Sequence, residues 1–397
     1  MPTTKPNVYA GIDTHANTHH VAVIDELGRH LDDHEFPTTA QGLTAIYAFL
    51  VSFGTLIRVG IEGTASYGAG VTALLRSYDI TVREVIRPNR QARRNGKSDP
   101  IDAYAAAQTV AADDTLPIPK LLNGPIDTIR VLLKTRHSAV KARTTAIRQI
   151  RSFLVTAPYR VREAYEHESA RQLITGILKA TPRHDDVFLS TLQLLARRHE
   201  TLATEEADIE ATLAPMITTI APALIAMKGA KTVTAAQLLI TLGENAERIH
   251  SKAAFAALCG VSPIPASSGK TNRMRLNRGG DRQANRALHT IALNRMSNDG
   301  RTRSYVAKRV GEGKTKREII RCLKRYIANE VYRHVTRPQE VPAIDDLRPL
   351  RQSKKITLQT IAEEFGVWPM KVSTIERGKS RDDEFASRYR KFLLNVA

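Results

Sequence analysis

The order of strand and helix patterns in the first 112 residues restricts the fold of this 397-residue chain more than any other feature. Apolar and polar residues alternate over residues 8–13, 19–24 and 29–36, as is typical of half-buried strands. The patterns that follow indicate a helix over 41–51, a strand over 57–61, a helix over 70–78, a strand over 81–86 and a helix over 102–111. The order β-β-β-α-β-α-β-α predicts a mixed α/β sheet in which three antiparallel strands precede the crossovers.

Four carboxylates lie at the ends of these predicted elements. Asp13 ends the first strand and Glu62 ends the fourth, while Asp99 and Asp102 open the last helix. Because Asp99 and Asp102 are three residues apart, they share one face of a helical turn. A charged group at a strand end costs free energy unless it is paired or binds a cation. Such a cluster suits Mg²⁺ or Mn²⁺, and a pair of these ions holds the attacking and leaving oxygens of a phosphodiester.

Each of these carboxylates also has a simpler interpretation on its own. Asp99 is a residue type that caps helix N-termini, and Asp13 could cap a turn. Glu62 could pair with Arg58 or Arg94. The presence of all four, in this order on this topology, favours a shared cation site.

A strong excess of positive charge points to a polyanionic partner. The chain has 59 Lys and Arg against 40 Asp and Glu, a net charge of +19. Residues 270–337 contain 19 basic and 5 acidic residues, a net of +14, with apolar residues interleaved among the charges. This interleaving favours basic helices over a disordered tail, and nucleic acid is the first candidate partner.

The middle and end of the chain divide into further predicted units. Residues 115–119 form a linker, and apolar residues then recur near a heptad rhythm, which favours two long helices in an antiparallel hairpin or a self-associating coiled coil. We expect Pro215 and Pro222 to end this region, and residues 338–349 to form a second linker. The domains predicted on this basis are 1–116, 117–221, 222–338 and 345–397.

A loop over residues 261–280 carries two adjacent serines, with Lys and Arg residues following them. Ser268 directly precedes a glycine, and Ser267 is its neighbour. A serine hydroxyl is a poor nucleophile until a base, a metal or a positive field activates it. Cationic side chains around the loop could hold a phosphate and stabilise developing charge: Lys270, Arg273, Arg275, Arg278, Arg282 and Arg286.

Upstream, residues 227–236 resemble a helix-hairpin-helix with Gly229 at its turn, and both phosphate binding and a purely structural turn remain open.

The last 48 residues have the apolar spacing of a helix-turn-helix core. The stretch over 350–378 resembles the Cro or phage-repressor type, and Lys371, Ser373 and Thr374 would then face a DNA groove. Trp368 stands where that type usually has a small polar N-cap. A structural or protein-binding three-helix unit is the alternative interpretation.

Three stretches carry a resemblance to a known family: Tyr9–His15, Gly60–Tyr67, and Arg87 to Ala103 with its Asp-Pro-Ile-Asp-Ala run. They resemble the DEDD transposases, which are insertion-sequence recombinases. The resemblance implies an N-terminal RuvC-like domain of RNase H fold and a mainly α C-terminal serine domain. It further implies that the four carboxylates are catalytic metal ligands and that Ser268 attacks DNA to form a covalent phosphoserine link. Guidance by an element-encoded (bridge) RNA is also implied.

Two other classes of function remain open on the sequence. One is a RuvC-like, structure-specific endonuclease without serine catalysis, and the other is a non-catalytic DNA-binding regulator. The heptad-like helices favour a homo-dimer or tetramer. The chain has no 18-residue apolar run, no signal-peptide pattern at its start, and two cysteines, so we expect a cytoplasmic protein without a membrane partner.

Overall fold

The computed structural model describes residues 5–86, 98–182, 186–267, 274–338, 340–378 and 381–396. It groups the chain into two compact units, one formed by residues 1–127 with 242–250 and the other by residues 128–241 with 251–397. A membrane-spanning helix, which needs both length and a continuous apolar stretch, is not found in the part of the chain that the structure describes.

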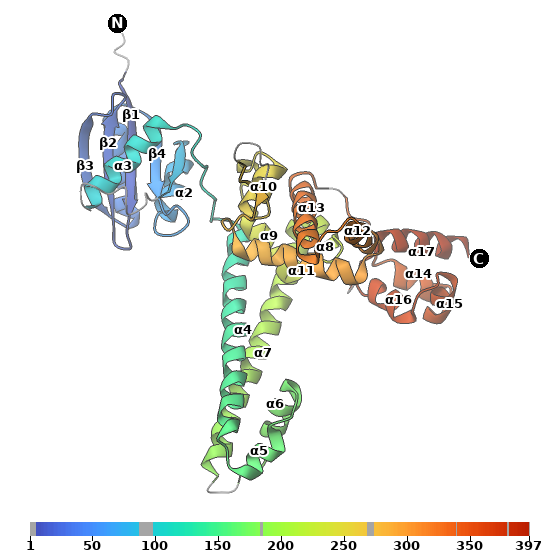
Figure 1. Cartoon of the computed structure of the whole chain (residues 1–397). Coiled ribbons are helices and arrows are strands. Elements are labelled where there is room, and N and C mark those ends of the chain that lie inside the picture. The colour runs from blue at the N-terminus through green and yellow to red at the C-terminus, as the bar shows by residue number, and fades with distance from the viewer. Residues whose placement is uncertain are drawn as a thin grey trace. The chain divides into compact units, whose positions relative to one another are not determined.

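A five-stranded mixed sheet forms the centre of the first unit, in the order β3-β2-β1-β4-β5 (Figure 1). Its strands are β1 (Asn7–Thr14), β2 (Thr18–Asp25), β3 (His30–Pro37), β4 (Thr55–Glu62) and β5 (Val82–Val85). The first three strands pair antiparallel, whereas β1, β4 and β5 pair parallel. The predicted order of elements is therefore confirmed, and the sheet is consistent with an RNase H-like fold.

Helices cover both faces of this sheet. The apolar face packs against α1 (Ala40–Ser52) and α2 (Ala69–Ser77), with Ile12, Ile46 and Ile61 fully buried in the shared core. The opposite face is covered by α3 (Asp99–Ala112), which lies across β1 and β2 in Figure 1. Because side chains alternate between the faces of a strand, Asp13 shares the α3 face with Gly11, two residues before it.

Two long helices begin the second unit and run antiparallel, side by side (Figure 1). They are α4 (Pro125–Val155) and α7 (Val187–Ile220), joined through α5 (Tyr159–Tyr165) and α6 (Ala170–Lys179). Arg136 on α4 donates from Nε to Glu210 on α7 over 2.7 Å and also pairs with Glu206. The predicted antiparallel pair of helices is confirmed, whereas its self-association stays a prediction.

One expectation for this region is wrong. Pro215 does not end its helix, because α7 continues through it to Ile220. An internal proline removes one backbone hydrogen bond, and here the apolar face buried on both sides of it offsets that loss, with Leu213 and Ile217 fully buried. Pro222 instead begins the short helix α8 (Pro222–Ala226).

Helices α10 (Lys252–Leu258), α11 (Arg282–Asn298) and α12 (Gly300–Gly311) pack against α13 (Lys316–Thr336). Helix α9 (Thr232–Leu242) precedes them in the chain. The C-terminal helices are α14 (Leu347–Ser353), α15 (Leu358–Glu364), α16 (Pro369–Glu376) and α17 (Asp383–Asn395), and they share a separate apolar core. The expected linker over 338–349 is shorter than predicted, because α14 already begins at Leu347.

Candidate functional site

Two glycines allow the helix that carries Asp99 and Asp102 to lie directly on the sheet. Gly11 on β1 and Gly60 on β4 are adjacent in register. A Cβ atom on Gly11 would lie 2.0 Å from the Ala103 carbonyl oxygen, and one on Gly60 would lie 2.6 Å from that of Ala106. Close approach of two backbones is a setting that requires glycine. The small residues of the sequence motif thus bring the start of α3 to the carboxyl ends of β1 and β4.

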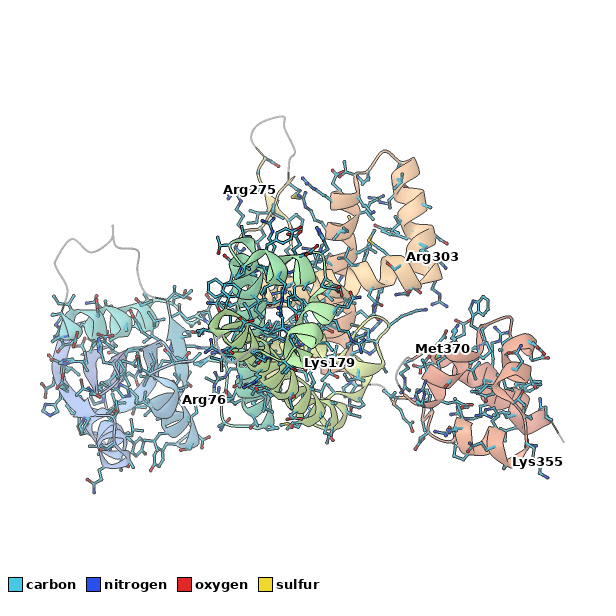
Figure 2. All side chains as sticks on the ribbon, turned by 90° about the horizontal axis from the view of Figure 1, so that it is seen from below. Arg76, Lys179, Arg275, Arg303, Lys355 and Met370 are labelled. Carbon is cyan, nitrogen blue, oxygen red and sulfur yellow. The ribbon has the colours of Figure 1, made fainter. Side chains whose placement is uncertain are left out.

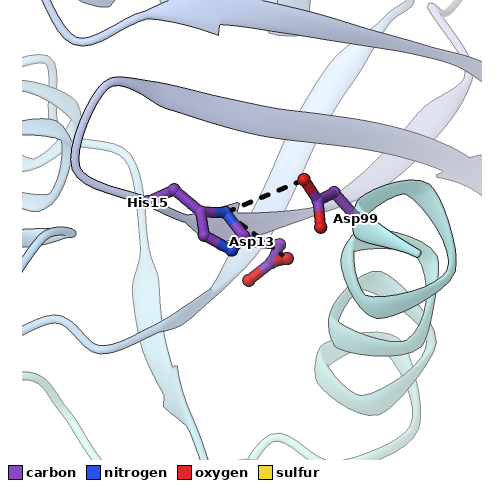
Figure 3. A group of neighbouring side chains, drawn as sticks. All are labelled: Asp13, His15 and Asp99. Carbon is purple, nitrogen blue, oxygen red and sulfur yellow. Dashed lines mark ion pairs between the residues drawn. The ribbon is translucent and has the colours of Figure 1, made fainter. Parts of the chain in front are cut away.

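Asp13 and Asp99 meet at this edge together with a histidine. Donor atoms of Asp13, His15 and Asp99 all lie within 4.8 Å of one another. Figure 3 shows the His15 ring facing both carboxylates, with Asp13 coming from β1 and Asp99 from the first turn of α3. Asp13 is buried, whereas the side chains of His15 and Asp99 are about two-fifths exposed, at 40% and 42%. The set is therefore open to solvent on one side and enclosed on the other.

The other two predicted carboxylates lie nearby on the same elements. Glu62 is buried at the end of β4, and the Thr14 hydroxyl donates to its backbone carbonyl over 2.9 Å, which ties the ends of β1 and β4 together. Asp102 is buried in the first turn of α3, three residues after Asp99. The N-cap of α3 is Ser98. The simpler interpretation of Asp99 as the N-cap is therefore wrong, and its carboxylate faces His15.

A second polar group beside the site was missed from the sequence. Asp33 accepts a hydrogen bond from the Tyr104 hydroxyl over 3.0 Å and lies 2.6 Å from Nε2 of His20, which faces Asp13 across β1 and β2. Burial and the Asp33 carboxylate together raise the pKa of Tyr104 to about 12. Burial would raise the pKa of Asp33, but its hydrogen bonds with His20 and Tyr104 outweigh this effect and hold that pKa below its usual range. Asp33 on β3, His20 on β2 and Tyr104 on α3 are far apart in the sequence, and no local pattern predicts that they meet.

Hydrogen bonds and a close backbone approach hold the two ends of the serine loop together. Asp281 donates its backbone N–H to the Leu258 carbonyl over 2.6 Å, and a Cβ on Gly280 would lie 2.6 Å from that same oxygen. Asn285 donates to the carbonyls of Cys259 and Gly260, both over 3.0 Å. Beyond these contacts, β6 (Ile264–Pro265) pairs antiparallel with β7 (Met274–Arg275). The loop therefore leaves and re-enters the helical domain at one place.

The predicted nucleophile and two of its basic neighbours, Ser268, Lys270 and Arg273, lie outside the described residues. Ser267, which is described, follows β6 by two residues. The other predicted phosphate contacts are exposed side chains on β7, the following turn and α11: Arg275 (Figure 2), Arg278, Arg282 and Arg286. Each of these four arginines is therefore accessible to a ligand.

The turn predicted to resemble a helix-hairpin-helix is held by neighbouring helices. Gly229 has a positive φ of 80° and packs against α11. Arg295 donates to the Lys228 carbonyl over 2.7 Å, and the Lys228 ammonium lies 3.2 Å from Asp299. These contacts support the structural interpretation of this turn.

The C-terminal helices are held by a buried ion pair. Arg351 on α14 donates from Nε to Glu376 on α16 over 2.7 Å, and the Tyr389 hydroxyl of α17 donates to the same carboxylate over 2.7 Å. Lys371, a predicted groove contact, lies 3.1 Å from Asp382.

The remaining predicted contacts lie on the same helix. Thr374 donates to the Lys371 carbonyl, and the Ser373 carbonyl accepts from Arg377. Trp368 is the N-cap of α16 and makes no side-chain capping bond. Its side chain is 83% exposed, and that of Met370 (Figure 2) is 66% exposed. Base reading by these residues stays a prediction.

Comparisons with known proteins match both halves of the chain. Residues 10–157 match a model described as "Transposase", that of the DEDD transposases of IS110 elements, and residues 221–307 match one described as "Transposase IS116/IS110/IS902 family". An "Insertion element IS110 uncharacterized 43.6 kDa protein" of Streptomyces coelicolor is 26% identical over 377 residues, covering 80% of this chain and 91% of the relative. The first matched region contains the site of Asp13 and Asp99, and the second contains the serine loop. Together these matches support the IS110-type DEDD transposases as the family of this chain.

Proposed function

We propose that this protein is the transposase of an insertion sequence, which cuts and rejoins DNA strands with the help of a divalent cation and a serine nucleophile. The observation that carries the proposal is the convergence of Asp13 and Asp99, from two separate elements, at the edge of the sheet where β4 ends in Glu62. The matches to transposase models support the same activity.

The donor set fits a divalent cation. Oxygen ligands suit Mg²⁺ and Mn²⁺, and the carboxylates of Asp13, Glu62, Asp99 and Asp102 are the proposed ligands. A bound ion of this kind polarises a phosphoryl oxygen and stabilises the charge of an attacking or leaving oxygen. The chain itself contributes the positioning, because Gly11 and Gly60 fix the distance between the sheet and α3.

We further propose Ser268 as the nucleophile, with Ser267 as the alternative. Attack of the serine oxygen on a DNA phosphorus would form a phosphoserine bond and release the deoxyribose hydroxyl of the broken strand, so the bond energy is kept for rejoining. The exposed Arg275, Arg278 and Arg282 beside the serine loop would hold the phosphate and offset its developing charge.

The nucleic-acid partners follow from the charge of the same region. Helices α11 to α13 lie within the block of residues 270–337, whose net charge is +14. Such a surface suits the backbones of duplex DNA and of structured RNA. We propose donor and target DNA as substrates, an element-encoded guide RNA as a further partner, a dimer or tetramer as the active form, and α14 to α17 as a DNA-binding module.

The test is to trap a covalent protein–DNA adduct and to map the modified residue. The full chain is incubated with DNA of the element's ends, any co-purified RNA and Mg²⁺, then denatured and analysed by mass spectrometry. We expect an adduct at Ser268 that is lost in Ser268→Ala and in Asp13→Asn. The variants Ser267→Ala and Ser297→Ala, the latter an exposed helix serine, should keep the adduct.

Each other outcome identifies a different function. Loss of the adduct in Ser267→Ala alone would move the nucleophile to that residue. Metal-dependent cleavage without any adduct would indicate an endonuclease without serine catalysis. DNA binding without cleavage under every condition would indicate a regulator.

A further inference from the structure

His15 is held beside the candidate cation site by the hairpin between β1 and β2. Its backbone N–H donates to the Thr18 carbonyl over 3.0 Å, which closes the turn directly after β1. The preceding residue, Thr14, is tied to the end of β4 through the Glu62 carbonyl. These two hydrogen bonds fix the chain at His15 and at the residue before it, and so hold the imidazole at this edge of the sheet.

The His15 ring lies close enough to both carboxylates to share one cation with them. Nδ1 of His15 lies 3.8 Å from Oδ2 of Asp13 and 4.0 Å from Oδ2 of Asp99 (Figure 3). Both separations exceed the roughly 3.2 Å of an N–H···O hydrogen bond. Two ligands that each lie about 2.1 Å from one ion are at most about 4.2 Å apart. Both gaps are therefore too wide for hydrogen bonds but lie within the span that a single ion can bridge.

We infer that His15 supplies a nitrogen ligand, through Nδ1, to the divalent cation held by Asp13 and Asp99. This inference rests on the proposed cation site and adds a residue and a metal preference to it. Mg²⁺ strongly prefers oxygen ligands, whereas an imidazole nitrogen suits transition metals. A centre with one imidazole and two carboxylates therefore favours Mn²⁺ over Mg²⁺ more strongly than a centre of carboxylates alone.

The test uses Mn²⁺ alone as a paramagnetic probe bound to the full chain. Electron spin echo envelope modulation detects a nitrogen nucleus that is bonded to Mn²⁺, and this readout does not depend on activity. We expect nitrogen modulation in the wild type and its loss in His15→Gln and His15→Asp. His15→Asp should still bind Mn²⁺, because it replaces the nitrogen ligand by an oxygen ligand, but with a smaller preference for Mn²⁺ over Mg²⁺.

Affinity and a matched histidine give the controls. Loss of a group that only orients a metal ligand costs about 10- to 100-fold in metal affinity, so His15→Gln should weaken Mn²⁺ binding by at least about 10-fold. His250→Gln changes an exposed histidine of the same compact unit and should alter neither signal nor affinity. Circular dichroism of each variant checks the fold.

The two possible failures are distinguishable. Tight Mn²⁺ binding without nitrogen modulation, or modulation that persists in His15→Gln, would overturn the role of His15 and leave the cation site intact. Absence of Mn²⁺ binding in the wild type, or equal binding by Asp13→Asn, would remove the proposed cation site and this inference with it.

Discussion

At the scale of single residues, the candidate cation site depends on two glycines that have no Cβ atom. Gly11 and Gly60 stand side by side where α3 crosses the sheet, and any larger residue would meet the helix backbone. The carboxylates of Asp13 and Glu62 lie two residues further along the same strands, on the same face. The space that admits the helix is therefore also what sets the separation between Asp13 and Asp99.

Replacing Gly11 by alanine should disturb both stability and metal binding. The added Cβ would lie 2.0 Å from the Ala103 carbonyl oxygen and 2.3 Å from the Ala107 nitrogen, so α3 must move away from the sheet. Overpacking of this kind costs about 1–3 kcal/mol or more. We expect a lower urea-unfolding midpoint by circular dichroism, and weaker Mn²⁺ binding because Asp99 moves with the helix.

Gly300→Ala is the matched control, since nothing lies within 4 Å of a Cβ atom at that position. It should leave the Mn²⁺ affinity unchanged and should not lower the midpoint, because alanine fits a helix at an unstrained position at least as well as glycine. An unchanged Mn²⁺ affinity in Gly11→Ala would contradict the argument that helix spacing sets the site.

At the scale of elements, helix ends are fixed by side chains far apart in sequence. Asp299 is the N-cap of α12, and its carboxylate accepts from the Thr302 backbone N–H over 3.0 Å. The same carboxylate lies 3.2 Å from the Lys228 ammonium at the turn before α9. Burial would raise the pKa of Asp299, but the bonds from Thr302 and Lys228 outweigh it and hold the pKa below its usual range.

Asp299→Ala should therefore lower stability in a pH-dependent way. A carboxylate whose pKa is depressed by folding stabilises the native state above its unfolded pKa of about 3.9, and this contribution is lost as pH falls through the native pKa. Loss of an N-cap costs about 0.5–2 kcal/mol. We expect a lower thermal unfolding midpoint at pH 7, and convergence of variant and wild type in more acidic solution.

Asp299→Asn separates the cap from the charge. Asparagine caps helices as well as aspartate does but cannot pair with Lys228 as an anion. It should retain most of the midpoint and lose the pH dependence. A constant difference between Asp299→Ala and wild type at every pH would refute the role of the charge.

An element or a site residue can be predicted from the sequence where the pattern that specifies it lies within one short segment. Strands and helices of the first unit follow from alternation and from turn residues within each segment, so the sequence predicts their order. It also indicates Asp13 and Asp99, because each stands at the end of its own element. It does not indicate His15, because the proposed role of His15 arises from a hairpin that brings it close to an element far away in the sequence. The sequence misplaces the helix end at Pro215, because burial on both sides of that residue depends on packing partners.

At the scale of the whole molecule, one short segment returns to the first unit. Residues 242–250 belong to the second matched region, 221–307, yet they group with residues 1–127. Asn245 donates to the Pro119 carbonyl over 2.9 Å and accepts from the Leu121 N–H over 3.0 Å. Glu244 accepts from the Ile126 N–H over 2.6 Å. The first unit is therefore completed by chain from the region that also carries the serine loop.

Asn245→Ala should loosen that connection without touching either candidate site. Asn245 is only 3% exposed. The variant therefore removes the hydrogen bonds of the Pro119 carbonyl and the Leu121 N–H at a place that water does not easily reach. An unsatisfied buried group costs about 1–3 kcal/mol. We expect faster hydrogen exchange at Leu121 and faster proteolysis around residues 117–124. Asn298→Ala, at an exposed asparagine, should change neither rate. Unchanged exchange at Leu121 in Asn245→Ala would mean that residues 1–127 hold this segment without the returning chain.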